Sequence, residues 1–295
     1  MDSERKFPLI LSNFWLKVIA LVTMTIDHIG YLLPYSTIAI IFRYIGRLAL
    51  PLFCFMIAEG AIHTKNFNKY AFRLGLMASI ISIAIIGSEY IPFFKDNGFS
   101  MRDEGNIFID LLLGAVAIYL LRQDKWYIKL LAILPIAFGI ASFIAMSLES
   151  CGCHGYILWF PFFLRTQYGW YGILTIVGFY AAHYFAKIFL KYHSSLTGIS
   201  LDLYKGSNIE RHTLNIISVV ALVFTTLLLY LNVKLMPERY TSIINVEIQL
   251  VAIASGAFIL LYNGLRGYNK KWFQYGSYLY YPIHMAILYL IFAFI

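Results

Sequence analysis

The chain alternates between long apolar stretches and short polar connections along its whole length. Nine stretches of 16 to 25 residues are predominantly apolar. A helix needs about 20 apolar residues to cross the hydrocarbon of a bilayer. The pattern therefore predicts an all-α, polytopic membrane protein with about nine transmembrane helices, over residues 14–34, 37–61, 70–88, 106–121, 126–147, 169–190, 213–232, 244–263 and 273–295.

The composition supports this fold class. Of the 295 residues, 60% are hydrophobic and only 13% are charged, and the mean hydropathy is +0.72. Soluble domains are about 45–50% apolar and about 25% charged, so a soluble enzyme, a disordered regulator and a nucleic-acid binder are excluded. We see no internal repeat, no room for a soluble domain in any connection and no cleavable signal peptide. We expect a single transmembrane domain over residues 1–295.

Basic residues in the connections predict the orientation, because cytoplasmic loops are enriched in Lys and Arg. Taken alternately, one set of connections carries 16 basic residues and the other carries five. The N-terminus belongs to the first set, so we expect it in the cytoplasm and the C-terminus outside. The net charge of +8 then divides into +11 on the cytoplasmic side, −1 outside and −2 within the spans.

Four ionisable residues in the first two predicted spans fall at a similar depth. Asp27 and His28 lie in the outer half of the first span, and Arg43 and Arg47 share one helical face in the outer half of the second. A charge at the bilayer centre costs about 2.5–3.5 kcal/mol unless it is paired or hydrated. Two interpretations follow: an Asp–Arg pair that pins the first hairpin, or an active site. Neighbouring helical residues point about 100° apart, so Asp27 would hold an arginine while His28 faces a cavity.

Other polar residues within the spans are harder to interpret. His284 lies in the last span, two residues after Pro282, and is either a packing residue or part of a cavity lining. Glu59 and His63 are predicted to form an interfacial pair, and Asp110 and Glu247 lie near outer helix ends. The outer cluster Cys151-Gly152-Cys153-His154 lacks the four ligands of a structural zinc site, so no metal site is predicted.

Five short blocks, in order between residues 16 and 288, resemble the TraX family of membrane proteins, named for the F-pilin acetylase. Met24-Thr25-Ile26-Asp27-His28 continues a Leu16–Leu21 block, and Gly46-Arg47 precedes Pro51-Leu52-Phe53. The other three are Glu104–Ile107, Tyr168-Gly169 with Tyr171-Gly172, and Tyr280–His284.

The resemblance implies a transmembrane acyltransferase that moves an acetyl group from cytoplasmic acetyl-CoA to an amine or hydroxyl acceptor. That acceptor would be a glycan, lipid or peptide of the cell envelope, pilin included, and the protein would reside in the bacterial inner membrane. The resemblance assigns the catalytic site to Asp27, His28, Arg47 and His284. It adds Asn106 and Tyr168 as further candidates for the donor site.

The chemistry of the residues agrees with this assignment. A neutral histidine suits a general base, and Arg47 or Arg43 could stabilise an oxyanion. We also expect Arg43 to contact the donor, and Lys65, Lys69 and Arg73 to bind the phosphates of acetyl-CoA. His28 could act as a base or become acetylated itself; the residues leave both open.

Two other functions compete with the acyltransferase. In a proton-coupled transporter or flippase, Asp27, His28, Arg43, Arg47 and His284 would form a polar gate. In a non-catalytic membrane subunit, the same cluster would only hold the helices together.

Overall fold

The protein is helical throughout the computed structural model, which describes residues 8–96, 101–150, 152, 160–236 and 246–293. Within those ranges no β-strand forms, and a single bridge pairs Leu11 with Tyr262. The predicted all-α class is confirmed. The α-helices are α1 (Asn13–Leu32), α2 (Thr37–Gly46), α3 (Ala49–His63), α4 (Phe67–Tyr90), α5 (Pro92–Asp96), α6 (Ile107–Leu121), α7 (Trp126–Leu130), α8 (Ile133–Ser150), α9 (Trp170–Thr197), α10 (Leu201–Tyr204), α11 (Asn208–Leu235), α12 (Val246–Gln249), α13 (Gly256–Leu260) and α14 (Lys271–Ala293), with 3₁₀ turns η2 (Phe162–Leu164) and η4 (Leu250–Ser255).

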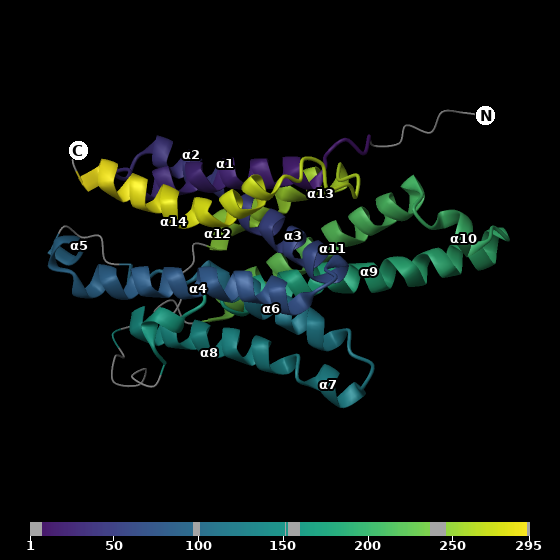
Figure 1. Ribbon diagram of the computed structural model, residues 1–295, viewed down its shortest axis with the longest axis horizontal. Helices are drawn as coiled ribbons and strands as arrows, with labels where there is room; N and C mark the ends of the chain where they lie inside the picture. The colour runs from purple at the N-terminus through teal and green to yellow at the C-terminus, as the bar shows by residue number, and fades with distance from the viewer. Residues whose placement is uncertain (1–7, 97–100, 151, 153–159, 237–245, 294–295) are drawn as a thin grey trace.

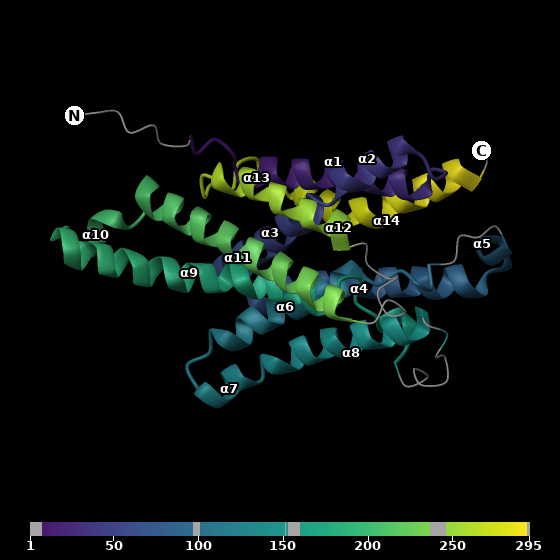
Figure 2. The same ribbon diagram turned by 180° about the vertical axis from the view of Figure 1, so that it is seen from behind.

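The long helices lie roughly along one axis of an elongated bundle (Figures 1 and 2). α14 ends and α5 lies at one end of this axis, and α10 lies at the other. α1 begins partway along the axis, on the side of α10, and α7 lies on the same side. α9 and α11 pack side by side, and α14 packs against α1. The connections predicted to be cytoplasmic that contain α7 and α10 therefore lie toward the same end of the bundle.

Six helical segments among the described residues are long and apolar enough to cross a membrane. They are α1, the pair α2–α3, α4, α7 continuing into α8, α9 and α11. Two other predicted spans correspond to shorter helices, α6 and the interrupted segment Val246–Leu260. At 1.5 Å per residue, the 15 residues of α6 cover about 22 Å, less than the ~30 Å of hydrocarbon. The structure thus supports a multi-pass membrane protein, while nine spans and their orientation remain predictions.

The second span is broken into α2 and α3 at Arg47 and Leu48. Their backbone N–H groups bond to the carbonyls of Tyr44 and Ile45, each at 3.2 Å, in the tighter three-residue pattern. Pro51 explains the break, since it has no N–H to donate to Arg47 and its ring would collide with that carbonyl in a continuous helix. The break turns the Arg47 side chain toward α1.

A loop after α13 folds back onto the start of α1. The Leu11 N–H donates to the Leu261 carbonyl at 2.9 Å, and the Asn263 N–H donates to the Leu11 carbonyl at 2.8 Å. The Asn13 N–H bonds to the carbonyl of Leu265 at 2.8 Å. These contacts place residues 262–269 beside the first turns of α1, where a cavity opens.

The segment before α6 is enclosed by its neighbours. The Asn106 N–H donates to the Arg165 carbonyl at 2.8 Å, and its side-chain amide donates to the Ala78 carbonyl at 2.7 Å. A side-chain carbon at the preceding residue, Gly105, would overlap the backbone of Thr166 and Gln167. Close approach of two backbones therefore requires glycine at position 105.

We expect Gly105→Ala to destabilise the protein by about 1–3 kcal/mol, because the added methyl group overpacks a rigid backbone contact. Gly276→Ala is the matched control, since no atom lies within 4 Å of its added carbon and alanine favours the helix. Thermal unfolding of the detergent-purified variants measures both. Equal melting temperatures for the two variants would contradict the close packing at Gly105.

Candidate active site

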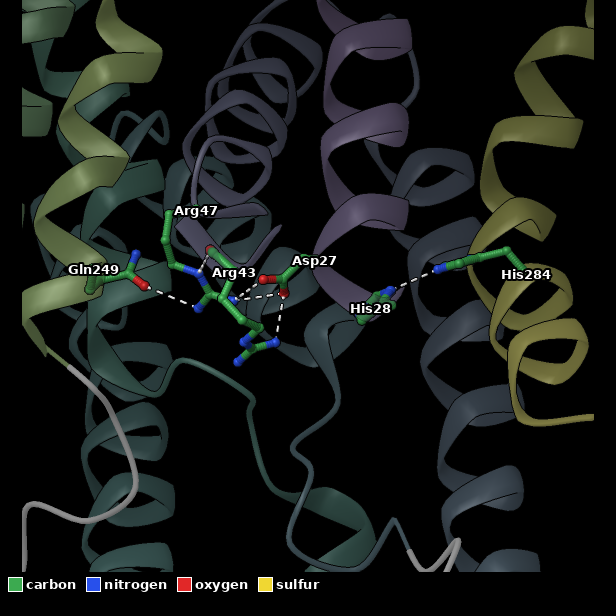
Figure 3. A network of polar contacts seen from close by, with 6 residues as sticks. All are labelled: Asp27, His28, Arg43, Arg47, Gln249 and His284. Atoms are coloured by element: carbon green, nitrogen blue, oxygen red, sulfur yellow. Dashed lines mark hydrogen bonds and ion pairs between the residues drawn. The ribbon is translucent and has the colours of Figure 1, made fainter. Parts of the chain in front are cut away.

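Asp27 forms ion pairs with both arginines of the second span. Arg47 donates from Nη2 to the two carboxylate oxygens at 2.5 and 2.7 Å, and Arg43 Nη1 lies 3.1 Å from Oδ2. Asp27 is buried, as is most of Arg47, whereas the Arg43 side chain is 32% exposed. The four residues expected at one depth thus include a charge-paired trio, of which Asp27 and Arg47 are buried and Arg43 is partly exposed (Figure 3).

Arg47 is enclosed by hydrogen-bond acceptors. Its Nε donates to the Arg43 carbonyl at 3.2 Å, and its Nη1 donates to Gln249 of α12 at 3.4 Å. A side-chain carbon at Gly46 would overlap Asp27, so glycine at this position lets α1 approach the break in the second span. The Arg43 side chain, in contrast, forms one hydrogen bond among the described residues, to Asp27, and lies over the ring of Tyr31, 5.3 Å from its centroid. Of the two arginines, Arg43 therefore has more side-chain N–H groups without a hydrogen-bond partner among the described residues.

His28 points away from Asp27, toward α14 (Figure 3). Its Nδ1 lies 2.7 Å from Nε2 of His284, and the two rings stack with centroids 4.9 Å apart. One turn earlier on α1, the Thr25 hydroxyl contacts the Tyr280 hydroxyl at 2.7 Å. These two polar contacts join α1 to α14. His284 therefore belongs to the same site as His28.

The hydrogen bonds assign the proton positions of this histidine pair. Nδ1 of His284 lies 2.8 Å from the Tyr280 carbonyl, which can only accept, so this nitrogen carries the hydrogen. In a neutral ring Nε2 of His284 is then an acceptor, and Nδ1 of His28 donates to it. Nε2 of His28 is left with its lone pair. That atom can take up a proton or attack an electrophile.

A cavity of about 430 Å³ runs between α1, α3, α4, α6 and α14. Its inner end is lined by Met24, Phe108 and Tyr281. The Tyr281 ring lies 5.8 Å from the His28 ring and 5.6 Å from the His284 ring, centroid to centroid. Tyr281 is therefore the partition between the cavity and the histidine pair.

The outer lining of the same cavity comes from the helix ends near the start of α1. Its basic side chains are Lys17, Arg73 and Arg266. Of the three residues expected to bind phosphates, only Arg73 lines the cavity; Lys65 and Lys69 are exposed and outside its lining. Lys17 and Arg266 were not expected there, because they are far apart in sequence and meet only where the loop after α13 returns to α1.

Comparison with known proteins identifies the family. The pattern of the family described as "TraX protein" matches residues 12–292. This chain belongs to the TraX family. No solved structure matches it.

Two curated relatives are similar to part of this TraX-family chain. One, named "Probable fimbrial assembly protein FimC, serogroup H1", from Dichelobacter nodosus, is 33% identical over 141 residues. The other, "Uncharacterized protein RP591" from Rickettsia prowazekii, is 31% identical over 144 residues. Each match covers 44% of this chain and 54% of the relative, so the chain spans about half the length of the curated relatives it matches.

The remaining TraX-like residues have mainly structural contacts. The Asn106 side chain caps α6 at the Phe108 N–H, 3.0 Å away, and also donates to Ser82, 3.1 Å away. All its polar atoms are thus engaged within the protein. The Tyr168 phenol lies beside Arg47, which places it at the ion-pair side of α1 rather than in the cavity. The Tyr168 N–H donates to Asp110 at 3.3 Å.

Two carboxylates differ from their expected surroundings. Asp110 lies in the first turn of α6, near a helix end as expected, but it is fully buried and accepts the Gln167 N–H at 2.7 Å, so it stabilises the turn before α9. Glu59 is buried in the cavity wall and lies 2.8 Å from Nε2 of His183 on α9. It is therefore not an interfacial residue paired only with His63. Cys151, Cys153 and His154 lie outside the described residues.

Several residues of this site were missed in the sequence. Gln249 and His183 are isolated polar residues in apolar stretches, and a single polar residue there gives no periodic pattern. Tyr281 was named only as part of the Tyr280–His284 block, without a role. Their roles depend on which helix lies opposite. The one available signal was the polarity of Gln249 and His183 within otherwise apolar stretches.

We expect Asp27→Asn to lower the free energy of unfolding by about 3–5 kcal/mol, because it leaves a buried arginine without its counter-charge. Glu247→Gln is the matched control: Glu247 pairs with Lys234 at 3.0 Å, but its side chain is 71% exposed, and exposed pairs contribute at most about 1 kcal/mol. Chemical or thermal unfolding in detergent compares the two. A loss of stability no larger for Asp27→Asn than for Glu247→Gln would refute the pinning role.

Proposed function

We propose that this TraX-family protein is a transmembrane acyltransferase that transfers an acetyl group from cytoplasmic acetyl-CoA to an amine or hydroxyl acceptor. The observation that carries the proposal is the cavity. It leads from basic residues at the helix ends near the start of α1 to Tyr281, which packs against the His28–His284 pair. A donor with an anionic head and a reactive thioester end matches that gradient of polarity.

The nucleotide end of acetyl-CoA would bind at the basic mouth. Lys17, Arg73 and Arg266 supply three cations to the phosphates. This set replaces the Lys65, Lys69 and Arg73 group expected from the sequence. The pantetheine arm would extend inward, and movement of the Tyr281 ring would admit the thioester to His28.

The histidine pair would supply the acid–base chemistry. Nε2 of His28 takes the proton of the acceptor as the acceptor's nitrogen or oxygen attacks the thioester carbonyl. The carbon–sulfur bond then breaks, and the proton passes to the departing sulfur to give CoA. His284 holds His28 in the reactive tautomer, as the orienting member of a catalytic triad does.

Arg43 and Arg47 would have different roles in this mechanism. Arg43 is partly exposed and has free N–H groups, so it is the candidate to stabilise the oxyanion of the tetrahedral intermediate. Arg47 and Asp27 are positioning residues that hold α1, and with it His28, at a fixed rotation. Tyr168 supports Arg47 on that side.

The acceptor is expected in or beyond the membrane. The relative named as a probable fimbrial assembly protein supports a fimbrial or pilin subunit, and an envelope glycan or lipid amine offers the same chemical group. We place the protein in the bacterial inner membrane, where cytoplasmic acetyl-CoA and an envelope acceptor can meet across one bilayer.

We expect His28→Ala to slow CoA release from acetyl-CoA by about 10²–10⁴-fold, the usual contribution of a general base. His284→Ala should slow it by about 10²-fold, because the wrong tautomer of His28 becomes accessible. Thiol release by the purified, bilayer-reconstituted protein with a small amine acceptor measures both rates.

His193→Ala is the control for these variants, since His193 bonds to Tyr204 near α10, outside the cavity. Turnover equal to that of His193→Ala in both variants would refute the proposal. Solute uptake driven by a pH gradient, without an acyl donor and lost in His28→Ala, would point instead to the proton-coupled transporter.

We expect Lys17→Gln, Arg73→Gln and Arg266→Gln each to raise the KM for acetyl-CoA by about tenfold with little change in kcat, because each removes one phosphate contact. Lys65→Gln and Lys69→Gln are the controls and should leave KM within twofold. The same thiol-release assay, run over a range of acetyl-CoA concentrations, measures these constants. A larger increase in KM for Lys65→Gln or Lys69→Gln would contradict the prediction and indicate that the nucleotide binds away from the cavity mouth.

A further inference from the structure

The two sides of the cavity differ in polarity along its inner half. The α14 side presents Ser277 and Tyr278, with Gln274 in the first turn of the helix. α3 and α6 present the apolar side chains of Phe53, Met56, Ile57, Ile107 and Leu111, and the polar residues that α3 adds to the lining, Glu59 and His63, lie toward its C-terminal end. A donor that carries only an acetyl group would not need a cavity with one polar and one apolar side.

A pantetheine arm carries two amide groups, which need hydrogen-bond partners when they leave water. The α14 side offers them through an amide, a hydroxyl and a phenol. The five apolar side chains of α3 and α6 offer none, so a hydrocarbon is the group that fits against them. An acetyl group carries one methyl group, which covers little of that side.

The apolar side is large enough for a longer chain. Phe53 to Ile57 and Ile107 to Leu111 each extend over about 6 Å of helix. Met24 and Met56 add flexible, unbranched side chains that adapt to ligands of different length.

We infer that the α3–α6 side of the cavity is an acyl-chain pocket, and that the protein accepts acyl-CoA donors with chains of about four to six carbons as well as acetyl-CoA. The inference rests on the proposed acyltransferase function and extends its donor class. The reaction is unchanged: the acyl–sulfur bond breaks, the acyl–acceptor bond forms, and the acceptor proton ends on the sulfur of CoA.

Thiol release with acetyl-, butyryl- and hexanoyl-CoA tests the inference in the reconstituted full chain. Burial of each added methylene is worth up to about fourfold in affinity, so the KM should fall from acetyl- to butyryl- to hexanoyl-CoA. Met56→Trp and Leu111→Trp fill the pocket from α3 and from α6. Each should lower the ratio of hexanoyl to acetyl kcat/KM by at least tenfold, whereas Met56→Ala should raise it.

Ile83→Trp is the matched control, since it adds the same side chain at a position on α4 that is 68% exposed. It should leave the ratio within twofold of wild type. Turnover of acetyl-CoA with butyryl- and hexanoyl-CoA at least a hundredfold slower would overturn the inference and leave the acyltransferase proposal standing. So would a hexanoyl-to-acetyl ratio that is unchanged in Met56→Ala and in whichever tryptophan variants fold.

Failure of every acyl-CoA, acetyl-CoA included, to release thiol above the rate of His28→Ala would remove the proposed function and the inference with it. The two failures are therefore distinguishable in a single series of measurements.

Discussion

A carboxylate among apolar helices must be paired, and the ion pair of Asp27 with Arg47 is the contact on which the arrangement of the site depends. Its geometry requires glycine at position 46, so that α1 can approach the second span closely. It also requires the break before Pro51, which turns Arg47 toward α1. Together these features fix the rotation of α1 about its own axis.

The fixed rotation decides where His28 points. Neighbouring residues on a helix project about 100° apart, so holding Asp27 against the second span turns His28 toward α14. There the Tyr280 carbonyl sets the tautomer of His284, and His284 sets that of His28. A charge pair on one side of α1 thereby prepares an uncharged, proton-accepting nitrogen on the other. Asp27 and His28 therefore have separate roles, because adjacent residues of a helix project in different directions.

The cavity combines contributions that no single segment contains. Its mouth is basic because the loop after α13 brings Arg266 beside Lys17 and Arg73. Its inner half has one polar and one apolar side, since α14 faces α3 and α6 across it. An anionic head, a polar arm and a hydrocarbon end can each find matching surroundings along this path. That order is the physical basis of the proposal that the donor is an acyl-CoA.

The sequence predicted the helical class, the pairing of Asp27 with an arginine and the divergence of Asp27 and His28, because each follows from local spacing and from the cost of an unpaired charge in an apolar setting. His284 could be named from its motif, but not its bond to His28. The residues at the cavity mouth were predicted only in part: of Lys65, Lys69 and Arg73 only Arg73 lines the cavity, and Lys17 and Arg266 were not named as candidates. Asn106 was named as a candidate for the donor site from the resemblance, and the structure shows that its polar atoms are engaged by its neighbours.

The sequence by itself determined that this protein is a helical membrane protein, since hydrophobic length and composition depend only on the order of residues. It also determined which charges are costly enough to need partners. Only the tertiary structure decided which partners they find, which side chains line the cavity and which nitrogen of His28 keeps its lone pair. Those features depend on the contacts of α1 with α14 and of Arg47 with α12, between residues more than 200 positions apart, and on helix rotations that no local pattern encodes.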